Sequence, residues 1–209
     1  MRVLPAGASA VLVETEDGAQ AAALHAELLR RRRAGGEEAR ALAGVEEIVP
    51  AARTVLVTGL ADPGGFAREV VRWDVPAVRP GQGGVVELPV RFDGPDLGEV
   101  AELWGVRPEE VADVVVATAF RVAFCGFAPG FGYLAGLPRR LHVPRRATPR
   151  TAVPAGSVGL AGPYAGVYPR VSPGGWRIVG TTRAVVWDPS RDPAALLTPG
   201  VEVRFTVAR

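Results

Sequence analysis

The residues best suited to bind a charged ligand are three arginines in one proline-rich stretch. Arg145, Arg146 and Arg150 lie in the segment Pro-Arg-Arg-Ala-Thr-Pro-Arg, residues 144–150. A guanidinium is planar and permanently charged, so it can hold a carboxylate or a phosphate through two parallel hydrogen bonds. The prolines restrict the loop and reduce the entropy lost on binding. We expect at least one of the three to bind an anion; the alternative is a solvated basic loop.

Two serines and a histidine flank this stretch. Ser157 follows Gly156, and Ser172 precedes a Pro-Gly-Gly sequence. Neither serine lies in a nucleophile elbow, and no convincing Ser-His-Asp set is present. Each is therefore expected to hydrogen-bond either a ligand or the backbone of its own turn. His142 is the only histidine near the arginines, which makes it a candidate for proton transfer.

Three aromatic residues, Tyr133, Tyr168 and Trp176, recur in the same region. Each combines an apolar ring with a polar atom, so each can either line a pocket or fill a core. The surrounding blocks, 125–134, 144–157 and 168–176, are dense in glycine and proline. Such density excludes a long helix and predicts short strands joined by shaped turns. Rigid turns that carry arginines and aromatics favour a concave binding site.

The composition is that of a globular protein and argues against several classes. Of the 209 residues, 48% are hydrophobic and 22% are charged, which allows one or two domains. All 24 cationic residues are arginines and the net charge is only +2, so we expect no nucleic-acid partner. The absence of lysine excludes a P-loop of the Gly-Lys-Ser/Thr type.

The remaining composition gives little sign of redox, metal or membrane chemistry. The single cysteine, Cys125, cannot form a disulfide within the chain and ends an apolar run, where a small buried side chain is expected. No metal-ligand constellation stands out. The first residues show no signal peptide, and no apolar run reaches the ~20 residues of a membrane span. We therefore expect a cytoplasmic protein.

The first 80 residues predict a small α/β domain. Strands are expected at 10–14, 45–50 and 54–58, with a helix at 19–33. Asp62-Pro63 predicts a second helix start, because aspartate caps and proline fits the first turn. That helix is expected to carry Phe66, Val70 and Trp73. Residues 76–84 are interpreted as a linker.

Residues 85–209 predict a second domain rich in short strands. Asp96 is expected to cap a helix that runs to Trp104 and stops at Gly105, and a second helix is expected at 107–116. Many short strands with turn signals are typical of a closed barrel or a sandwich. The predicted strands are 85–92, 120–124, 157–161, 166–168, 177–180, 184–187 and 201–207.

The second half of the chain resembles a known family. Its blocks are similar to the C-terminal domain of the KipI / allophanate hydrolase subunit 1 family, and looser similarity extends over 88–97. The resemblance implies an α+β protein with a small N-terminal α/β domain and a cyclophilin-like β-barrel. The matching segments are 126–131, 133–134, 136–137, 144–146, 149–150, 153–158, 166–169 and 172–176.

The best-understood role in this family is that of the 5-oxoprolinase B subunit. The resemblance implies ATP-dependent hydrolysis of 5-oxoproline to glutamate, carried out with an A subunit, and with a C subunit that is homologous and cyclophilin-like. It implies no intrinsic cofactor, ATP use by the complex, and no activity of the chain alone. The arginines suit this chemistry because 5-oxoproline and a phosphorylated intermediate are both anions.

Two departures from the family pattern keep other functions open. A His-Thr-like pair of many members is Val115-Val116 here, and a usual arginine is Thr181. Loss of these groups is compatible with a binding module, such as a KipI-like inhibitor of a sensor histidine kinase. A third possibility is an accessory role in urea or allophanate metabolism.

Overall fold

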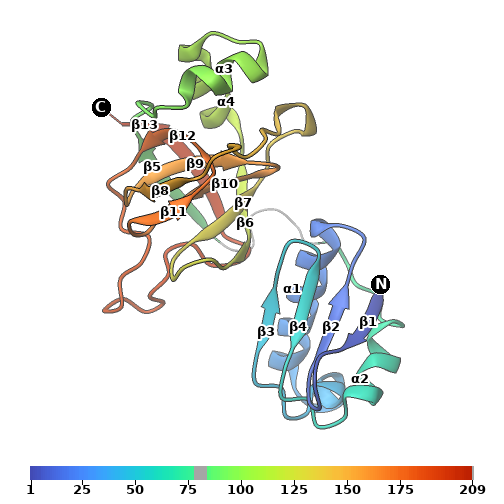
Figure 1. Ribbon diagram of the computed structural model, residues 1–209. Coiled ribbons are helices and arrows are strands. Elements are labelled where there is room, and N and C mark those ends of the chain that lie inside the picture. The colour runs from blue at the N-terminus through green and yellow to red at the C-terminus, as the bar shows by residue number, and fades with distance from the viewer. Residues whose placement is uncertain (78–83, 209) are drawn as a thin grey trace. The chain divides into compact units, whose positions relative to one another are not determined.

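The chain folds into two compact units in the computed structural model, which describes residues 1–77 and 84–208 (Figure 1). The first unit spans Met1–Pro80 and the second Gly81–Arg209. Most of the expected linker at 76–84 lies outside the described residues. That each unit is a domain able to fold alone stays a prediction. Within the described ranges, no helix is both long and apolar enough to span a membrane.

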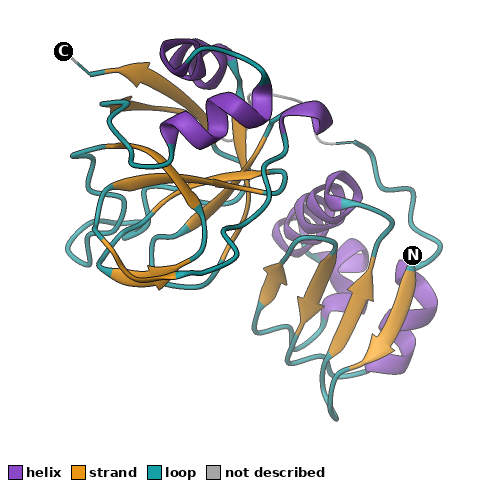
Figure 2. Cartoon of the chain, turned by 45° about the horizontal axis from the view of Figure 1, so that its top comes forward, coloured by secondary structure: helices purple, strands orange, loops and turns teal. Residues whose placement is uncertain are grey.

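The first unit is a four-stranded antiparallel sheet with helices on one face, as Figure 2 shows. The strands lie in the order β1-β2-β4-β3. Valines that alternate along the central strands pack against both α-helices and form a separate core. The elements are β1 Arg2–Pro5, β2 Val11–Glu14, α1 Gly18–Ala34, the 3₁₀ helix η1 Gly36–Leu42, β3 Ile48–Pro50, β4 Thr54–Val57 and α2 Pro63–Val70.

A local cap sets where α2 begins. Asp62 accepts a hydrogen bond from the Gly65 N–H at 2.8 Å, with Pro63 in the first turn, as predicted. The prediction that Trp73 belongs to this helix is wrong, because α2 ends at Val70. Trp73 instead lies under the guanidinium of Arg31, 4.1 Å from its ring centroid.

The second unit is built on a seven-stranded sheet in the order β12-β9-β10-β7-β6-β13-β5, with a two-stranded β11-β8 sheet beside it. Neighbouring strands of the large sheet are antiparallel except for β13 and β5. Its elements are β5 Val85–Val90, α3 Leu97–Trp104, α4 Pro108–Ala117, β6 Phe120–Cys125, β7 Gly132–Ala135, η2 Arg139–Leu141, β8 Arg150–Val153, β9 Ser157–Ala161, β10 Tyr164–Val167, β11 Ser172–Gly174, β12 Arg177–Thr181 and β13 Glu202–Val207.

The two ends of the large sheet meet, which makes it a nearly closed barrel. Arg91, just after β5, exchanges two backbone hydrogen bonds of 2.8 Å with Thr181 of β12. Helices α3 and α4 lie against β12 and β13, respectively. The expected α+β class, with a small N-terminal unit followed by a β-barrel, is confirmed.

The strand predicted at 184–187 is wrong. This segment forms only an isolated bridge between Trp187 and Ala195, and Val185 is exposed. Strand β12 already pairs with β9 on one side and with Arg91 on the other. Residues 184–187, which follow β12, therefore have no unpaired strand beside them with which to form a ladder. Four short strands were not predicted from the sequence: β1, β7, β8 and β11.

Candidate functional site

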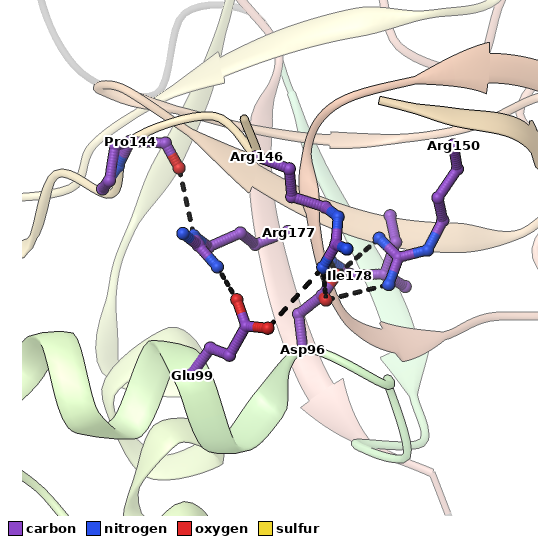
Figure 3. A network of polar contacts seen from close by, with 7 residues as sticks. All are labelled: Asp96, Glu99, Pro144, Arg146, Arg150, Arg177 and Ile178. Carbon is purple, nitrogen blue, oxygen red and sulfur yellow. Dashed lines mark hydrogen bonds and ion pairs between the residues drawn. The ribbon is translucent and has the colours of Figure 1, made fainter. Parts of the chain in front are cut away.

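Two of the three candidate arginines converge on one buried carboxylate, that of Asp96 (Figure 3). Arg150 binds it in a bidentate manner, with both N–O distances 2.8 Å. Arg146 Nη1 lies 2.6 Å from Asp96 Oδ1, and the Ile178 backbone N–H donates to Oδ2 at 2.7 Å. The Asp96 side chain is only 1% exposed. Four hydrogen bonds therefore offset the desolvation of this carboxylate.

This arrangement corrects the prediction that the Asp96 side chain caps α3. Asp96 does precede the helix, and its backbone carbonyl accepts the Val100 N–H at 3.0 Å, but its side chain makes no capping hydrogen bond. The segment 94–96 lies along β12, where the Asp96 N–H donates to the Ile178 carbonyl at 3.0 Å. The carboxylate is thereby held near the arginines, where two guanidiniums bind it and one of them does so in a bidentate manner.

Gly94 permits this close approach. A Cβ at Gly94 would collide with the backbone of Ile178 and Val179. We expect Gly94→Ala to lower the free energy of unfolding by about 1–3 kcal/mol through overpacking. Gly98→Ala is the matched control: Gly98 is helical and exposed, with no atom near its added Cβ, so it should stabilise by about 0.5–1 kcal/mol. Urea unfolding of both variants measures the difference; equal effects would contradict this reading.

A second carboxylate extends the network to the edge of the barrel. Glu99, on the first turn of α3, pairs with Arg177 of β12 and lies 3.6 Å from Arg146 Nη1. Arg177 Nε also donates to the Pro144 carbonyl at 3.1 Å. The network therefore joins α3, β12 and the loop that carries the candidate arginines. The buried Nε of Arg146 has no hydrogen-bond partner within residues 1–77 and 84–208.

The environment of Asp96 lowers its pKa. Burial by itself raises the pKa, but the Arg150 hydrogen bond, the Ile178 N–H and the charges of Arg150 and Arg146 together outweigh it. A folded-state pKa below the unfolded value of about 3.9 stabilises the fold above that pH, and the stabilisation is lost as the pH falls through the folded value.

The amide introduced by Asp96→Asn does not titrate, so this variant tests whether the Asp96 carboxyl makes the stability depend on pH. We expect the loss of unfolding free energy caused by this substitution to be largest above about pH 5 and to shrink as the pH falls below about 4. Chemical denaturation of both proteins from acid to neutral pH measures this difference. A pH-independent difference would contradict the assignment.

Arg145 differs from its two neighbours. It is exposed and has no hydrogen-bond or ion-pair partner among the described residues. The next residue, Arg146, donates its N–H to the Gly175 carbonyl at 2.8 Å, and Gly174 packs against the Tyr168 hydroxyl, so the chain at Arg145 passes near this tyrosine. Burial raises the pKa of the Tyr168 hydroxyl, whereas the Trp176 N–H and the charge of Arg145 act in the opposite direction. Of the three predicted arginines, Arg145 is the one left available for an anion.

The three aromatic candidates lie in one cluster, together with Phe131. The Phe131 ring lies edge-on to the other three, at centroid distances of 5.1 Å to Tyr133, 5.3 Å to Tyr168 and 5.3 Å to Trp176. Tyr168 and Trp176 are buried, and Tyr133 is partly buried. This cluster is distinct from the main barrel core. Packing is thus one role of these residues.

The remaining candidates lie outside the arginine network. The Ser172 hydroxyl donates to the Arg170 carbonyl at 3.1 Å, in its own turn. Ser157 is buried at the start of β9. His142 is exposed, with Nε2 3.1 Å from the Leu137 carbonyl. Cys125 contacts the Leu197 carbonyl at 3.1 Å, and burial raises the pKa of its thiol to about 11, so the reactive thiolate is scarce at neutral pH.

Sequence reasoning missed the acidic half of the network, Asp96 and Glu99, and it missed Arg177. The Asp96 partners lie 50 and 54 residues away, so no local spacing signals the contact. The only sequence signal is an aspartate in front of a helix, which a cap explains equally well. In the part of the chain that the structure describes, no group of three or more His, Cys, Asp or Glu residues is placed to hold a metal.

Fold and sequence together define the class of this protein. Residues 1–197 match the family model of the carboxyltransferase domain, subdomain C and D, and the chain belongs to this family. It is 42% identical to a protein from Escherichia coli O157:H7 that is named as the B subunit of 5-oxoprolinase. The match extends over 170 residues, which is 77% of each chain. A second protein of that name, from Haemophilus influenzae, is 44% identical over 129 residues, 60% of this chain and 61% of that protein.

A solved structure agrees with this relationship. The chain matches the crystal structure of TTHA0988 with a TM-score of 0.77 and 33% identity, over 97% of this chain but 40% of that one. The chain thus spans about two fifths of TTHA0988.

Proposed function

We propose that this chain is the B subunit of a 5-oxoprolinase, a hydrolase that opens the cyclic amide of 5-oxoproline to give glutamate. The observation that carries the proposal is the 42% identity to a protein of that name, over 77% of both chains. The fold and the arginine-rich site are compatible with this role.

We assign the substrate carboxylate to Arg145. Its side chain is exposed and unpaired among the described residues, and the following residue is hydrogen-bonded to Gly175, next to Trp176 of the aromatic cluster. A charge-assisted bidentate contact to a carboxylate suits a guanidinium that no internal acid already neutralises. Arg146 and Arg150 are already bound to Asp96, and we assign them the role of fixing the loop that presents Arg145.

The proposal includes the other parts expected from the sequence. The chain acts with the A and C subunits of the enzyme, of which the C subunit is its homologue, and the complex uses ATP in the cytoplasm. Two features support a divided activity: the chain lacks the lysine of a P-loop, and TTHA0988 matches it over only two fifths of a longer chain.

Reconstitution tests the proposal. The chain is co-expressed with the C subunit, the A subunit is added, and glutamate formed from 5-oxoproline is measured with and without ATP. We expect ATP-dependent glutamate that disappears when this chain is omitted. A stable complex that forms no glutamate, or glutamate formed equally well without this chain, would refute the assignment.

A further inference from the structure

One aromatic residue beside the site is held in an unfavourable backbone conformation. Phe127 has a φ of 67°, the only positive φ among the described non-glycine residues. The Ala128 N–H donates to the Gly126 carbonyl at 2.8 Å and closes a three-residue turn centred on Phe127. A γ-turn of positive φ is rare and strained, and a bulky residue is the least suited to it.

The surrounding loop holds this turn in place. The Gly126 N–H donates to the Phe131 carbonyl at 3.2 Å, and the Phe131 N–H donates to the Ala128 carbonyl at 3.0 Å. Gly130 packs so closely against Trp187 that a Cβ there would clash. Strained residues persist where surrounding contacts determine the backbone, and they concentrate at functional sites.

Burial does not account for the choice of phenylalanine. The Phe127 side chain is 57% exposed, although its ring edge touches the aromatic cluster. The centroid of the Phe127 ring lies 5.3 Å from that of Phe131 and 6.2 Å from that of Tyr168. The Arg146 N–H donates to the Gly175 carbonyl at 2.8 Å, and Gly174 packs against the Tyr168 hydroxyl. The chain segment that carries the unpaired Arg145 therefore runs past the same tyrosine that the exposed Phe127 ring contacts.

We propose that Phe127 is a ligand-contacting residue that packs against a small ring, while Arg145 binds the carboxylate carried by that ring. This inference rests on the proposed function and deepens it, since 5-oxoproline is a five-membered lactam with one carboxylate. An aromatic face suits the apolar part of such a ring, and a guanidinium suits its charge. The ligand class is therefore a cyclic carboxylic acid.

The test compares Phe127→Gly with Phe127→Tyr in the complex assembled with the A and C subunits. Glycine tolerates the positive φ and removes the ring, whereas tyrosine keeps the ring. We expect Phe127→Gly to raise KM for 5-oxoproline about tenfold or more, with the unfolding temperature of the chain within about 3 °C of wild type. Because it keeps the ring, Phe127→Tyr should raise KM much less than Phe127→Gly does. Leu103→Ala, which truncates another exposed apolar residue, on α3, is the control.

Several outcomes would overturn the inference. An unchanged KM for Phe127→Gly in a complex that turns over 5-oxoproline would refute it and leave the proposed function intact. A drop of more than about 5 °C in unfolding temperature with an unchanged KM would make Phe127 a packing residue. Failure to assemble with the C subunit would make it a partner contact.

A direct binding measurement separates this inference from the proposed function. Saturation-transfer NMR is recorded with 5-oxoproline on the wild-type complex and on the complex that carries Phe127→Gly. If no glutamate forms, but the wild type binds 5-oxoproline and the variant does not, the proposed function fails and the inference stands. Equal signals from both complexes, or no signal from either, would overturn the inference.

Discussion

Asp96→Ala is expected to lower the free energy of unfolding by about 3–5 kcal/mol, the largest stability effect that the structure predicts. The substitution leaves two arginine side chains, each about a quarter exposed, without their carboxylate, and it leaves the Ile178 N–H without an acceptor. Removing one partner of a buried ion pair costs more than the pair contributes, because the remaining charge stays desolvated.

Asp93→Ala is the matched control for this experiment. Asp93 also binds an arginine and a β12 residue, Arg91 and Thr181, but its side chain is 35% exposed. Such a pair contributes about 1 kcal/mol or less. Urea unfolding in a Trp73→Phe background follows only the tryptophans of the second unit, at 104, 176 and 187. Equal losses of unfolding free energy for Asp96→Ala and Asp93→Ala would show that burial of the carboxylate does not determine the destabilisation.

Arg145→Ala is expected to reduce kcat/KM for 5-oxoproline about 10- to 150-fold in the reconstituted complex, the equivalent of one charge-assisted hydrogen bond of about 1.5–3 kcal/mol. The unfolding temperature should stay close to that of wild type, because Arg145 is exposed and has no partner among the described residues. Steady-state glutamate formation and thermal unfolding of the same preparations measure the two quantities.

Two further variants control this prediction. Arg140→Ala removes an exposed arginine of η2 that has no partner in the described chain, and it should leave kcat/KM unchanged. Arg145→Lys keeps the charge but loses the planar guanidinium, so we expect a kcat/KM between those of Arg145→Ala and the wild type. Equal losses of kcat/KM for Arg145→Ala and Arg140→Ala would indicate a general effect of charge. An unchanged kcat/KM for Arg145→Ala would refute the role of Arg145.

Elements with strong local signals were predictable. Asp62-Pro63 specifies a helix start, and Gly105, with φ of 66°, ends α3 as expected. Such signals act within one turn of the chain, so they need no tertiary context. The barrel strands β9, a mostly apolar run, and β13, in which apolar and polar residues alternate, were predictable because both patterns are local.

Short strands within glycine- and proline-rich blocks were not predictable in this way. Strands β8 and β11 pair only with each other and contain three to four residues, so they have too few positions to show alternation. The segment 184–187 shows the opposite error. Its composition favours a strand, but the neighbouring strand edges are already occupied.

The sequence by itself determined the two-part α+β architecture, the family and the region in which the candidate site lies, because each follows from local patterns and ordered motifs. Only the tertiary structure decided how Arg145, Arg146 and Arg150 differ. They are neighbours in the chain with the same side chain, yet Asp96, 50 or more residues away, forms ion pairs with two of them and leaves Arg145 available. Charge pairing depends on distance in space, which residue order does not encode locally.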